Sequence, residues 1–366
     1  MSPPTSDIVI VLPDLRLGGA QRVMLTVARQ FASMGYGTAI VTLTKDGTLL
    51  DELPSDVRYR SLGFDNASLL TAGRALLKLV RYLREQKPRA ILSTMTGTNL
   101  LTTAAYDWAR VASRLVLREA VSTQNIKSRV MRHLLRHQYS RADAVVAVSQ
   151  GVADDLAKLR IRRSFMHVIP NPVDSVRLSQ LASCEPGIQL PTQPFIISVG
   201  RLTAQKDYET LIRAYALTKL RKSHLLLIVG DGEEREKLNG LVRNLGLERS
   251  VLFTGALLNP YPLIARSNLF VLSSRWEGYP NVILEALALK VPVIATDCPH
   301  GPREALQEGA LGRLSPIGDA SALARAMDAE LETPRRSDEC LGTYGCAAIA
   351  KKYLSVLLPE EERRNA

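Results

Sequence analysis

Short apolar runs alternate with longer amphipathic segments along nearly the whole chain, and this alternation restricts the fold more than any other feature. In the first half, the apolar runs predict strands at residues 8–12, 38–43, 57–62, 90–95, 114–118 and 144–148. In the second half, they predict strands at residues 195–199, 224–229, 251–255, 269–272, 292–296 and 312–316. Helical segments separate most of these strands, as they do in parallel sheets covered by helices. We therefore expect an α/β protein with two doubly wound parallel sheets.

The two halves meet between Val168 and Asp174, where Pro170 and Pro172 flank Asn171 and favour a stiff, extended connection. A chain of 366 residues suits two domains of ordinary size. We predict an N-terminal Rossmann-like domain at residues 1–172 and a C-terminal Rossmann-like domain at residues 173–345. A C-terminal segment at residues 346–366 contains a final predicted helix.

The composition is that of a globular protein, with 46% hydrophobic and 23% charged residues. No apolar run reaches the roughly 18–20 residues of a membrane span. The first residues lack a basic stretch followed by an apolar core, so we expect no signal peptide. Four cysteines lack the spacing of a metal site, and free thiols suit a reducing cytoplasm: Cys184, Cys298, Cys340 and Cys346.

The net positive charge comes from the first half of the chain. Residues 1–172 contain 24 Lys and Arg against 13 Asp and Glu, whereas residues 173–366 contain 23 of each. A basic half of this kind can bind nucleic acid, anionic lipid or an anionic substrate. Aromatic residues amount to only 5%, and no stacking or groove-reading motif is present. We therefore predict no nucleic-acid partner.

Two predicted helices of the first half carry much of this basic charge. Three cations share one face of the helix at residues 69–86, at i, i+4 and i+7: Arg74, Lys78 and Arg81. The helix at about 126–139 combines cations with an apolar stripe: Arg129, Arg132 and Arg136, with Val130, Met131, Leu134 and Leu135. A basic amphipathic helix is typical of peripheral binding to an anionic membrane. The alternative is that the stripe packs on the sheet and the arginines are only solvated.

Two loops that follow predicted strands have the composition of anion sites. Gly18-Gly19 stands between a strand and a helix, where backbone N–H groups and the helix dipole favour an anion. Gly200, Arg201 and Lys206 lie in a second loop of the same kind, which suits an anion in an open α/β sheet. The alternatives are a plain tight turn for the glycines and solvated cations for the second loop. The G-x-G-x-x-G fingerprint is absent, which argues against a nucleotide-binding oxidoreductase.

A third loop and the helix after it, from Ser273 to Leu287, contain the densest group of candidate residues. Gly278 and Pro280 mark a turn after a buried strand. From Val282 to Leu289 the only polar residue is Glu285, and a helix that is apolar all round is buried. We therefore expect a buried carboxylate, which requires a partner. That partner can be a ligand or an internal structural hydrogen bond.

The set Glu277, Gly278, Pro280, Asn281 and Glu285 closely resembles the signature of the retaining nucleotide-sugar glycosyltransferases of family 4. The likeness extends over nearly the whole chain. It implies the GT-B fold, in which two Rossmann-like domains face a central cleft and the last helix crosses back to the first domain. Residues 297–304 are similar to bacterial polysaccharide and lipid-linked oligosaccharide transferases. The donor implied is a nucleotide sugar, with UDP as the expected carrier.

The resemblance also implies roles for single residues. Arg201 and Lys206 would hold the donor diphosphate, Glu277 would lie near the donor sugar, and Glu285 would hold the ribose hydroxyls. Glu277, Arg201 and Lys206 are thus the predicted catalytic residues. The other predicted donor-binding residues, of which 255–257 would line the nucleobase pocket, are Gly18, Gly19, Gly200, Gly255, Ala256, Leu257, Gly278, Tyr279, Pro280, Asn281 and Val282. Because no Asp-x-Asp motif or ligand cluster is found, we predict neither a metal nor another cofactor.

Two positions depart from the family pattern. The segment Leu117-Arg118-Glu119-Ala120 lacks a His that many members carry there. Arg118 and Glu119 are predicted on the acceptor side, with an ordinary strand-end ion pair as the alternative. Arg74, Lys78 and Arg81 are predicted to contact the diphosphate of a lipid-linked acceptor. Lys290 replaces a usual Gly, which we interpret as a local loop difference.

Together these features predict a cytoplasmic glycosyltransferase, peripheral on the inner face of the plasma membrane. It would extend a lipid-linked saccharide during surface polysaccharide or glycan biosynthesis. Transfer to a soluble small-molecule acceptor is the alternative within enzymes. A non-catalytic basic membrane adaptor is the alternative of another class, and the intact set of Arg201, Lys206, Glu277 and Glu285 argues against it.

Overall fold

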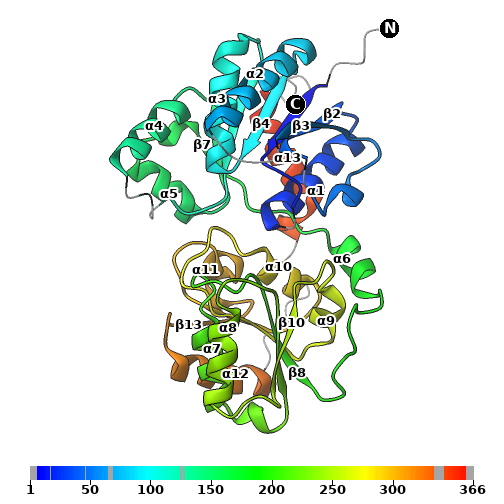
Figure 1. Cartoon of the computed structure of the whole chain (residues 1–366), viewed down its shortest axis with the longest axis vertical. Helices are drawn as coiled ribbons and strands as arrows, with labels where there is room; N and C mark the ends of the chain where they lie inside the picture. Colours follow the sequence, from blue (N-terminus) through cyan, green and yellow to red (C-terminus); the bar gives the residue numbers. More distant parts are fainter. Residues whose placement is uncertain are drawn as a thin grey trace. The chain divides into compact units, whose positions relative to one another are not determined.

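The computed structural model describes residues 6–16, 18–45, 47–64, 69–123, 126, 128–333 and 342–359. They form two compact units, each built on its own parallel sheet (Figure 1). Unit 1 comprises Met1–Pro172 together with Thr343–Ala366, and unit 2 comprises Val173–Gly342. The predicted α/β class with two parallel sheets is confirmed.

The sheet of unit 1 has seven parallel strands in the order β3-β2-β1-β4-β5-β6-β7. They are β1 (Ile8–Leu12), β2 (Thr38–Thr44), β3 (Arg58–Phe64), β4 (Ala90–Thr94), β5 (Arg114–Glu119), β6 (Ala144–Ala147) and β7 (Met166–Val168). Every residue of β1 and β4 is buried, as expected for central parallel strands with helices on both faces. The strand order reverses between β1 and β4, and ligands of such sheets bind beside the carboxyl ends at this point.

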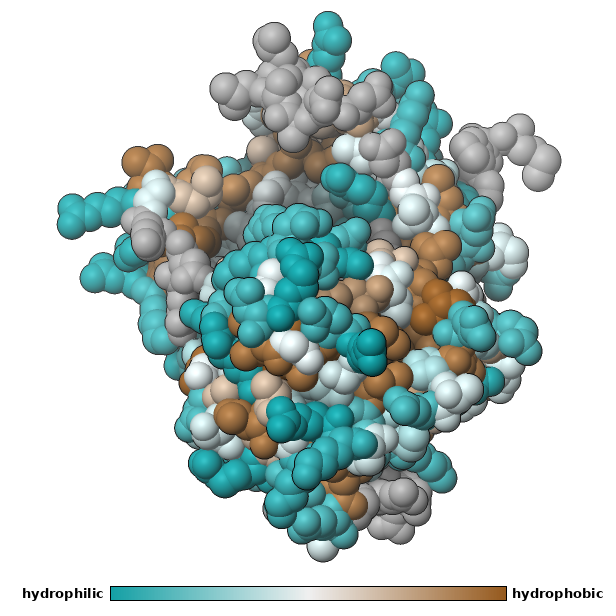
Figure 2. All heavy atoms as spheres, turned by 60° about the horizontal axis from the view of Figure 1, so that its bottom comes forward, coloured by the Kyte–Doolittle hydropathy of each residue, from teal (hydrophilic) through white to brown (hydrophobic). Residues whose placement is uncertain are grey.

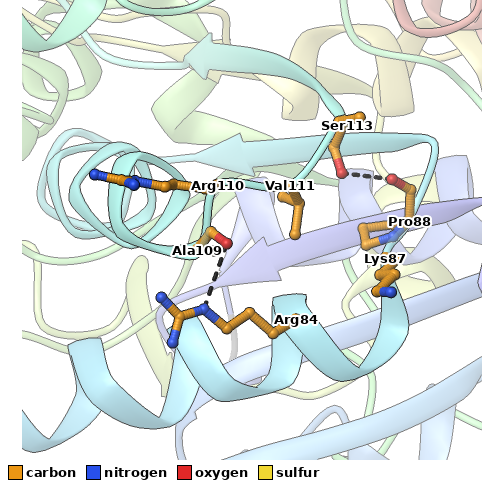
Figure 3. Close-up of a pocket in the computed structure, with 8 residues that line it drawn as sticks. Arg84, Lys87, Pro88, Ala109, Arg110, Val111 and Ser113 are labelled. Carbon is orange, nitrogen blue, oxygen red and sulfur yellow. Dashed lines mark hydrogen bonds between the residues drawn. The ribbon is translucent and has the colours of Figure 1, made fainter.

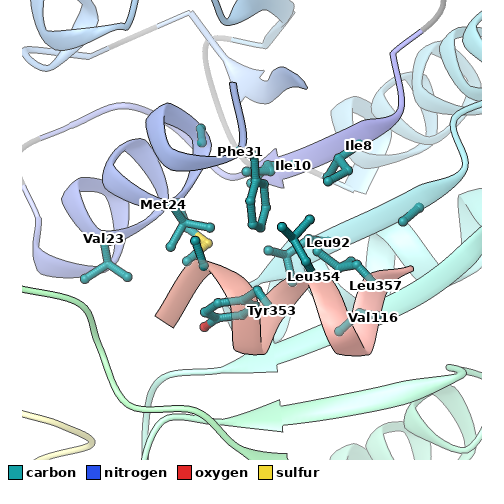
Figure 4. Close-up of a cluster of buried hydrophobic side chains, with 14 of the residues drawn as sticks. Ile8, Ile10, Val23, Met24, Phe31, Leu92, Val116, Tyr353, Leu354 and Leu357 are labelled. Atoms are coloured by element: carbon teal, nitrogen blue, oxygen red, sulfur yellow. The ribbon is translucent and has the colours of Figure 1, made fainter. Parts of the chain in front are cut away.

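The helices of unit 1 are α1 (Gly19–Ser33), α2 (Leu69–Gln86), α3 (Thr96–Ala109), α4 (Arg129–Tyr139), α5 (Gln150–Lys158) and α13 (Cys346–Leu357). Helix α13 comes from the end of the chain but packs beside α1 and the sheet (Figure 4). Its Tyr353, Leu354 and Leu357 share one buried cluster with Met24 and Phe31 of α1. The core of unit 1 therefore combines the two ends of the sequence.

Arg118 links this last helix to the sheet and to the connection between the halves. It is wholly buried, and its guanidinium donates to the Tyr353 hydroxyl (3.0 Å), to Thr94 Oγ1 (2.9 Å) and to Asn171 Oδ1 (2.6 Å). The prediction that Arg118 faces an acceptor is therefore wrong, because its charge is used inside unit 1. The alternative ion pair with Glu119 is also wrong, since these three neutral oxygens take its hydrogen bonds.

The sheet of unit 2 has six parallel strands in the order β10-β9-β8-β11-β12-β13. They are β8 (Phe195–Val199), β9 (Leu225–Val229), β10 (Val251–Gly255), β11 (Leu269–Leu272), β12 (Val293–Thr296) and β13 (Arg313–Ser315). The helices are α6 (Ser175–Ala182), α7 (Tyr208–Leu217), α8 (Arg235–Asn244), α9 (Tyr261–Arg266), α10 (Asn281–Ala288), α11 (Pro302–Ala305) and α12 (Ala320–Glu332). Single 3₁₀ turns lie at Leu50–Glu52, Arg163–Phe165, Lys219–Lys222, Gln307–Gly309 and Gly342–Tyr344.

Four short elements were not predicted, namely β7, α6, α9 and α11, because three to eight residues carry too little periodicity. Helix α4 begins at Arg129, three residues later than predicted. Lys290 has a φ of 60°, the left-handed conformation that favours glycine. The backbone at Lys290 thus has the conformation that a glycine would adopt there. The interpretation of a local loop difference is therefore wrong.

Candidate active site

The loop after β8, which carries the predicted cation Arg201, packs closely on the loop after β9. A Cβ atom at Gly230 would overlap the carbonyl oxygen of Gly200, and one at Gly232 would overlap that of Leu202. Gly230 also has a φ of 148°, which side chains rarely permit. Glycine at these two positions therefore lets the cation loop settle against its neighbour at the carboxyl edge of the sheet.

Lys206 and Glu277, predicted to act on the same donor, are in direct contact. Lys206 Nζ lies 2.6 Å from Glu277 Oε1, and the two side chains are only 17% and 8% exposed. Ser274 Oγ donates to the same carboxylate oxygen at 2.6 Å. An ion pair shielded to this degree is screened less than a surface pair. The loops after β8 and β11 thus form one site.

Hydrogen bonds to backbone carbonyl groups hold these two loops together independently of the ion pair. Gln205 Nε2 donates to the carbonyl oxygen of Trp276 at 2.9 Å, and the Arg275 N–H donates to the carbonyl oxygen of Gln205 at 2.8 Å. Ser273 Oγ donates to the carbonyl oxygen of Lys206 at 2.8 Å. The position of the Lys206 backbone is therefore fixed by contacts other than the ion pair of its ammonium group.

Arg201 and Arg275, the other cations of these two loops, differ in whether their charge is already paired. Arg275 Nε lies 3.1 Å from Asp207 Oδ2, and Asp207 also caps α7 by accepting from Thr210 N at 3.4 Å. Arg201 is exposed and forms no ion pair with any residue in the described part of the chain. Arg275 is thus used to fix the start of α7, whereas Arg201 is available for an anion.

The loop after β12 packs on the turn that opens α10. A Cβ atom at Gly301, whose φ is 94°, would lie 2.6 Å from Pro280 Cδ and 2.9 Å from Tyr279 Cα. Glycine is therefore required for this close approach. In the same loop, burial and the nearby Glu277 carboxylate raise the pKa of the Cys298 thiol to about 12. Cys298 is accordingly a neutral thiol beside the site, not a nucleophile.

Glu285 lies on α10 at the same edge of unit 2. It is half-buried, together with Asn281, Val282 and Ala288 on one stripe of the helix. The prediction that Glu285 is buried in a packed layer is therefore wrong, because this stripe faces away from the core. Tyr261 of α9 donates its hydroxyl to Glu285 Oε1 at 3.3 Å. The carboxylate is thus oriented by the protein and still accessible.

The residues predicted near the nucleobase follow β10. Gly255 ends the strand with a φ of 79°, and its carbonyl oxygen accepts from the N–H of Gly230 at 2.9 Å. Ala256 is exposed and Leu257 is half-buried. These residues share the carboxyl edge of the sheet with the loop after β8. Their contact with a base stays a prediction.

In unit 1, Gly18 directly precedes α1 at the carboxyl end of β1. A Cβ atom there would overlap Gln21 Oε1, and Gln21 Nε2 in turn donates to Asp14 Oδ1 at 2.9 Å. A side chain at position 18 would therefore displace the Gln21 side chain. Helix α1 starts at Gly19 with no acidic residue in its first turn. This helix start suits an anion. Diphosphate binding by Gly18 and Gly19 stays a prediction.

Glu119, at the carboxyl end of β5, is wholly buried. It accepts hydrogen bonds from the Tyr139 hydroxyl (2.6 Å), from Thr96 Oγ1 (3.0 Å) and from the N–H of Ala120 (3.2 Å). Burial raises the pKa of Glu119, and these hydrogen bonds offset the rise only in part. The prediction that Glu119 faces an acceptor is wrong, because its carboxylate instead ties the start of α3 to the end of α4.

Family models match both halves of the chain. Residues 17–177 match the model for Glycosyltransferase Family 4, and residues 187–345 match the model for Glycosyl transferases group 1. The lipopolysaccharide core biosynthesis glycosyltransferase LpsE of Rhizobium meliloti is 30% identical over 357 residues, which cover 93% of this chain and 96% of that protein. The chain belongs to the family 4 glycosyltransferases.

Another relative of this glycosyltransferase is the N-acetylgalactosamine-N,N'-diacetylbacillosaminyl-diphospho-undecaprenol 4-alpha-N-acetylgalactosaminyltransferase of Campylobacter jejuni. It is 31% identical over 227 residues, 60% of this chain and 61% of that protein, so the match spans less than two thirds of that relative. Among solved structures, Anabaena Alr3699/HepE in complex with UDP and glucose superposes with a TM-score of 0.75 and 20% identity. That superposition covers 98% of this chain and 99% of that one, and it shows the GT-B fold.

The cations of α2 in this glycosyltransferase do not form one unoccupied face. Lys78 Nζ donates to the carbonyl oxygen of Leu62 at 2.7 Å, and Arg81 Nε lies 2.7 Å from Glu85 Oε1. Arg74 is exposed and has no ion-pair partner among the described residues. Of the three predicted acceptor contacts, Arg74 is thus the one whose charge is not already engaged.

Helix α4 has its apolar stripe largely outside the core. Val130 is 79% exposed, and Met131 and Leu134 are each 38% exposed, whereas Leu135 is buried together with Tyr139. The arginines of the helix are exposed as well: Arg129, Arg132 and Arg136. The alternative that the stripe packs on the sheet is therefore wrong for three of its four residues. An exposed apolar strip now lies beside three exposed cations.

A cavity of about 450 Å³ lies at the opposite, amino-terminal edge of the unit 1 sheet (Figure 3). Its Arg84 donates to the carbonyl oxygens of Trp108 (2.7 Å) and Ala109 (3.4 Å) at the end of α3. Arg110 points away from Arg84 in Figure 3. Arg84 is therefore engaged at the carbonyl end of α3, where the helix dipole disfavours an anion. We therefore assign this cavity no ligand.

Within the described residues, no three His, Cys, Asp or Glu side chains are grouped so that they could hold a metal ion. No helix in that part of the glycosyltransferase is both long and apolar enough to cross a bilayer. On the face drawn in Figure 2, hydrophilic residues predominate and hydrophobic residues form small groups between them. The exposed strip of α4 is an apolar surface with cations beside it.

Proposed function

We propose that this glycosyltransferase is a retaining, metal-independent enzyme that transfers a sugar from a UDP-sugar to a lipid-linked saccharide acceptor. The observation that carries the proposal is the 2.6 Å contact between Lys206 and Glu277, next to the exposed Arg201. The contact lies at the carboxyl ends of β8 and β11, the edge of an α/β sheet where ligands bind. Two cations in the loop after β8 and a carboxylate in contact with one of them suit a substrate that carries both phosphate and sugar.

The chemistry requires stabilisation of two charges. When the sugar–phosphate bond breaks, negative charge grows on the leaving diphosphate and positive charge grows on the anomeric carbon. In the proposal, Arg201, Lys206 and the N-terminus of α10 stabilise the diphosphate. Glu277 stabilises the positive sugar carbon through its negative charge. These groups supply the required charge from the protein itself.

For the nucleotide, we propose that Glu285 accepts hydrogen bonds from both ribose hydroxyls and that Gly255, Ala256 and Leu257 contact the base. The half-buried position of Glu285 and its hydrogen bond from Tyr261 support this role. UDP as the carrier is supported by the structural likeness to Alr3699/HepE, which was solved with UDP. On the unit 1 side, Gly18 and Gly19 are proposed to contact the diphosphate.

A lipid-linked acceptor is supported by the names of the relatives and by the surface of α4. The Campylobacter jejuni relative is named for a diphospho-undecaprenol substrate, and LpsE is named for lipopolysaccharide core biosynthesis. An acceptor of this type is anchored in a membrane. The exposed Val130, Met131 and Leu134, flanked by arginines, suit an anionic membrane surface. We propose peripheral attachment to the cytoplasmic face of the plasma membrane.

The donor assignment is tested by a thermal-shift screen of UDP-, GDP- and ADP-sugars. A ligand at about 100 times its Kd stabilises the folded protein by about 2.7 kcal/mol. We expect a UDP-sugar to stabilise the protein and a GDP- or ADP-sugar to have no effect. The hit is then incubated with polyprenyl-diphosphate saccharides and with soluble saccharides, and the anomeric configuration of the product is read by NMR. Product formed only on soluble acceptors, or with inverted configuration, contradicts the corresponding part of the proposal.

Metal independence is tested with a chelator. Because Arg201, Lys206 and the start of α10 can carry the diphosphate charge, full activity is expected in excess EDTA. Initial rates with and without EDTA provide the measurement, and a parallel sample with added Mg²⁺ serves as the control. Complete loss in EDTA that Mg²⁺ or Mn²⁺ restores would contradict the proposal.

A further inference from the structure

Ser274 is a wholly buried residue that the predicted set of site residues did not include. It follows β11 by two positions, and its backbone carbonyl accepts a hydrogen bond from Thr296 Oγ1 of β12. Its own Oγ donates to Glu277 Oε1 at 2.6 Å, the oxygen that also faces Lys206 Nζ. The serine is therefore anchored to the sheet by its backbone and holds the carboxylate with its side chain.

The two oxygens of the Glu277 carboxylate have different surroundings. Oε1 receives both the hydroxyl of Ser274 and the ammonium group of Lys206. Oε2 receives no hydrogen bond from any residue in the described ranges. The N–H of Glu277 donates to the carbonyl oxygen of Pro299 at 3.3 Å, which fixes the backbone as well. The carboxylate is thus held by one oxygen, and the other is left for a ligand.

We propose that Ser274 is a positioning residue that orients Glu277 so that Oε2 faces the donor sugar. The inference rests on the proposed function, because it assumes that Glu277 acts on that sugar. A short hydroxyl side chain buried at the end of a strand has few conformations to lose. Ser274 can therefore fix the carboxylate more rigidly than the long Lys206 side chain can.

This division of roles explains why two donors serve one oxygen. Lys206 carries three N–H donors on a flexible stem and is proposed to bind the diphosphate as well. When its ammonium group moves toward the phosphates, Ser274 keeps Glu277 in place. The simpler alternative is that Ser274 only satisfies a buried polar group. The two accounts differ in whether the effect of Ser274 passes through Glu277.

The test is a double-mutant cycle on donor hydrolysis, with Ser274→Ala, Glu277→Gln and the combined variant. Loss of a hydrogen bond to a charged group typically changes a rate or equilibrium constant by about 10- to 100-fold. S274A is therefore expected to lower kcat by that factor. In the E277Q background the same change is expected to alter kcat by less than about twofold. The Kd for UDP is expected to stay within about twofold in S274A, because Arg201 and Lys206 are intact.

The matched control is Ser315→Ala, which removes a buried hydroxyl that has no hydrogen-bond partner among the described residues of unit 2. It is expected to leave kcat unchanged. Unchanged turnover in S274A would overturn the proposal. So would an equal loss in both backgrounds with weaker UDP binding, because that pattern indicates a structural role. Wild-type protein that binds no nucleotide sugar would overturn the proposed function itself, and this inference with it.

Discussion

Single polar side chains decide the geometry of the loops after β8 and β11. Lys206 and Glu277 form the shielded pair, while Asp207 and Arg275 form a second pair that fixes the start of α7. Arg201 is exposed and has no ion pair with the described residues. Loss of Arg201 or Lys206 should therefore affect chemistry, whereas loss of Arg275 should affect local structure.

Arg201→Ala and Lys206→Ala are each expected to lower kcat by about 10²–10³, the usual effect of losing one donor to a developing negative charge. Initial rates at saturating donor provide the measurement. Arg221→Ala removes an exposed cation of the Lys219–Lys222 turn, which follows the far end of α7, and should leave turnover unchanged. Near-wild-type turnover in both site variants would remove these residues from the diphosphate site.

Glu285→Gln is expected to raise the Kd for UDP about tenfold, which corresponds to about 1.4 kcal/mol. An amide keeps part of the hydrogen bonding, and the site is only half-buried, so the free energy of unfolding should change by less than about 1 kcal/mol. Titration calorimetry and urea unfolding measure the two quantities. Tyr261→Phe keeps the carboxylate and should give a smaller loss of affinity. Unchanged affinity with much lower stability would make Glu285 structural.

The sequence predicts that these residues share one edge of the sheet, for a physical reason. Strands that alternate with helices form parallel sheets, so the loops at their carboxyl ends share one edge. This brings Arg201, Lys206, Glu277 and Glu285 to the same edge of unit 2. The contact of Ser274 with Glu277 was not predicted, because the sequence does not indicate where a serine hydroxyl points. Its place three residues before Glu277 was the one available signal.

At the scale of elements, α4 has three apolar residues on its exposed side and two residues in the core. Leu135 and Tyr139 attach the helix to the core, whereas Val130, Met131 and Leu134 do not. Each Lys or Arg near an anionic membrane contributes about 1 kcal/mol, and this contribution decays over a Debye length of roughly 8–10 Å. On this scale, we expect three arginines and an exposed apolar strip to give reversible binding.

Changing Arg129, Arg132 and Arg136 to Glu is expected to abolish flotation with anionic vesicles and to leave donor hydrolysis intact. In the wild type, added salt should release the protein from the vesicles. The matched control makes the same charge change in α2: Arg74, Lys78 and Arg81 to Glu. That variant should still float, and its acceptor KM should rise. Equal loss of flotation in both would indicate a response to net charge alone, and no change in either would contradict membrane docking.

Sequence patterns failed at Arg118 and Glu119 for an element-level reason. Successive residues of a strand point to opposite faces, and both faces of β5 are covered here. On one face, Tyr353 of α13 meets Arg118, and on the other Tyr139 of α4 meets Glu119. Which helix covers a strand end depends on tertiary packing, so a strand-end charge cannot be assigned to solvent or core from the sequence.

For the whole molecule, the last helix is part of the first core. Besides Ala350, five large side chains of α13 are buried in unit 1: Ile349, Tyr353, Leu354, Val356 and Leu357. At about 1.5–3 kcal/mol for each buried apolar side chain, their burial is comparable to the 5–15 kcal/mol that stabilises a typical domain. Only the resemblance indicated that this helix crosses back, because its apolar pattern does not name the sheet that it covers.

Deletion of residues 343–366 is therefore expected to unfold unit 1 and to leave unit 2 folded. Calorimetry should show loss of one thermal transition, and hydrogen exchange should show loss of protection in β1, β4 and β5. Removal of residues 360–366 alone is the control and should preserve both transitions. Two retained transitions in the longer deletion would show that α13 contributes little to the core.

The buried Arg118, held at once by Asn171 and Tyr353, has a consequence for how such enzymes can be recombined. In the order of the chain, unit 2 is an insertion between Pro172 and Thr343 of unit 1. A chimera made with a single crossover after Pro172 inherits its final helix from the wrong parent and pairs that helix with a foreign sheet. Exchange of an intact unit 2 between relatives requires two crossovers, so that the whole of Val173–Gly342 moves together.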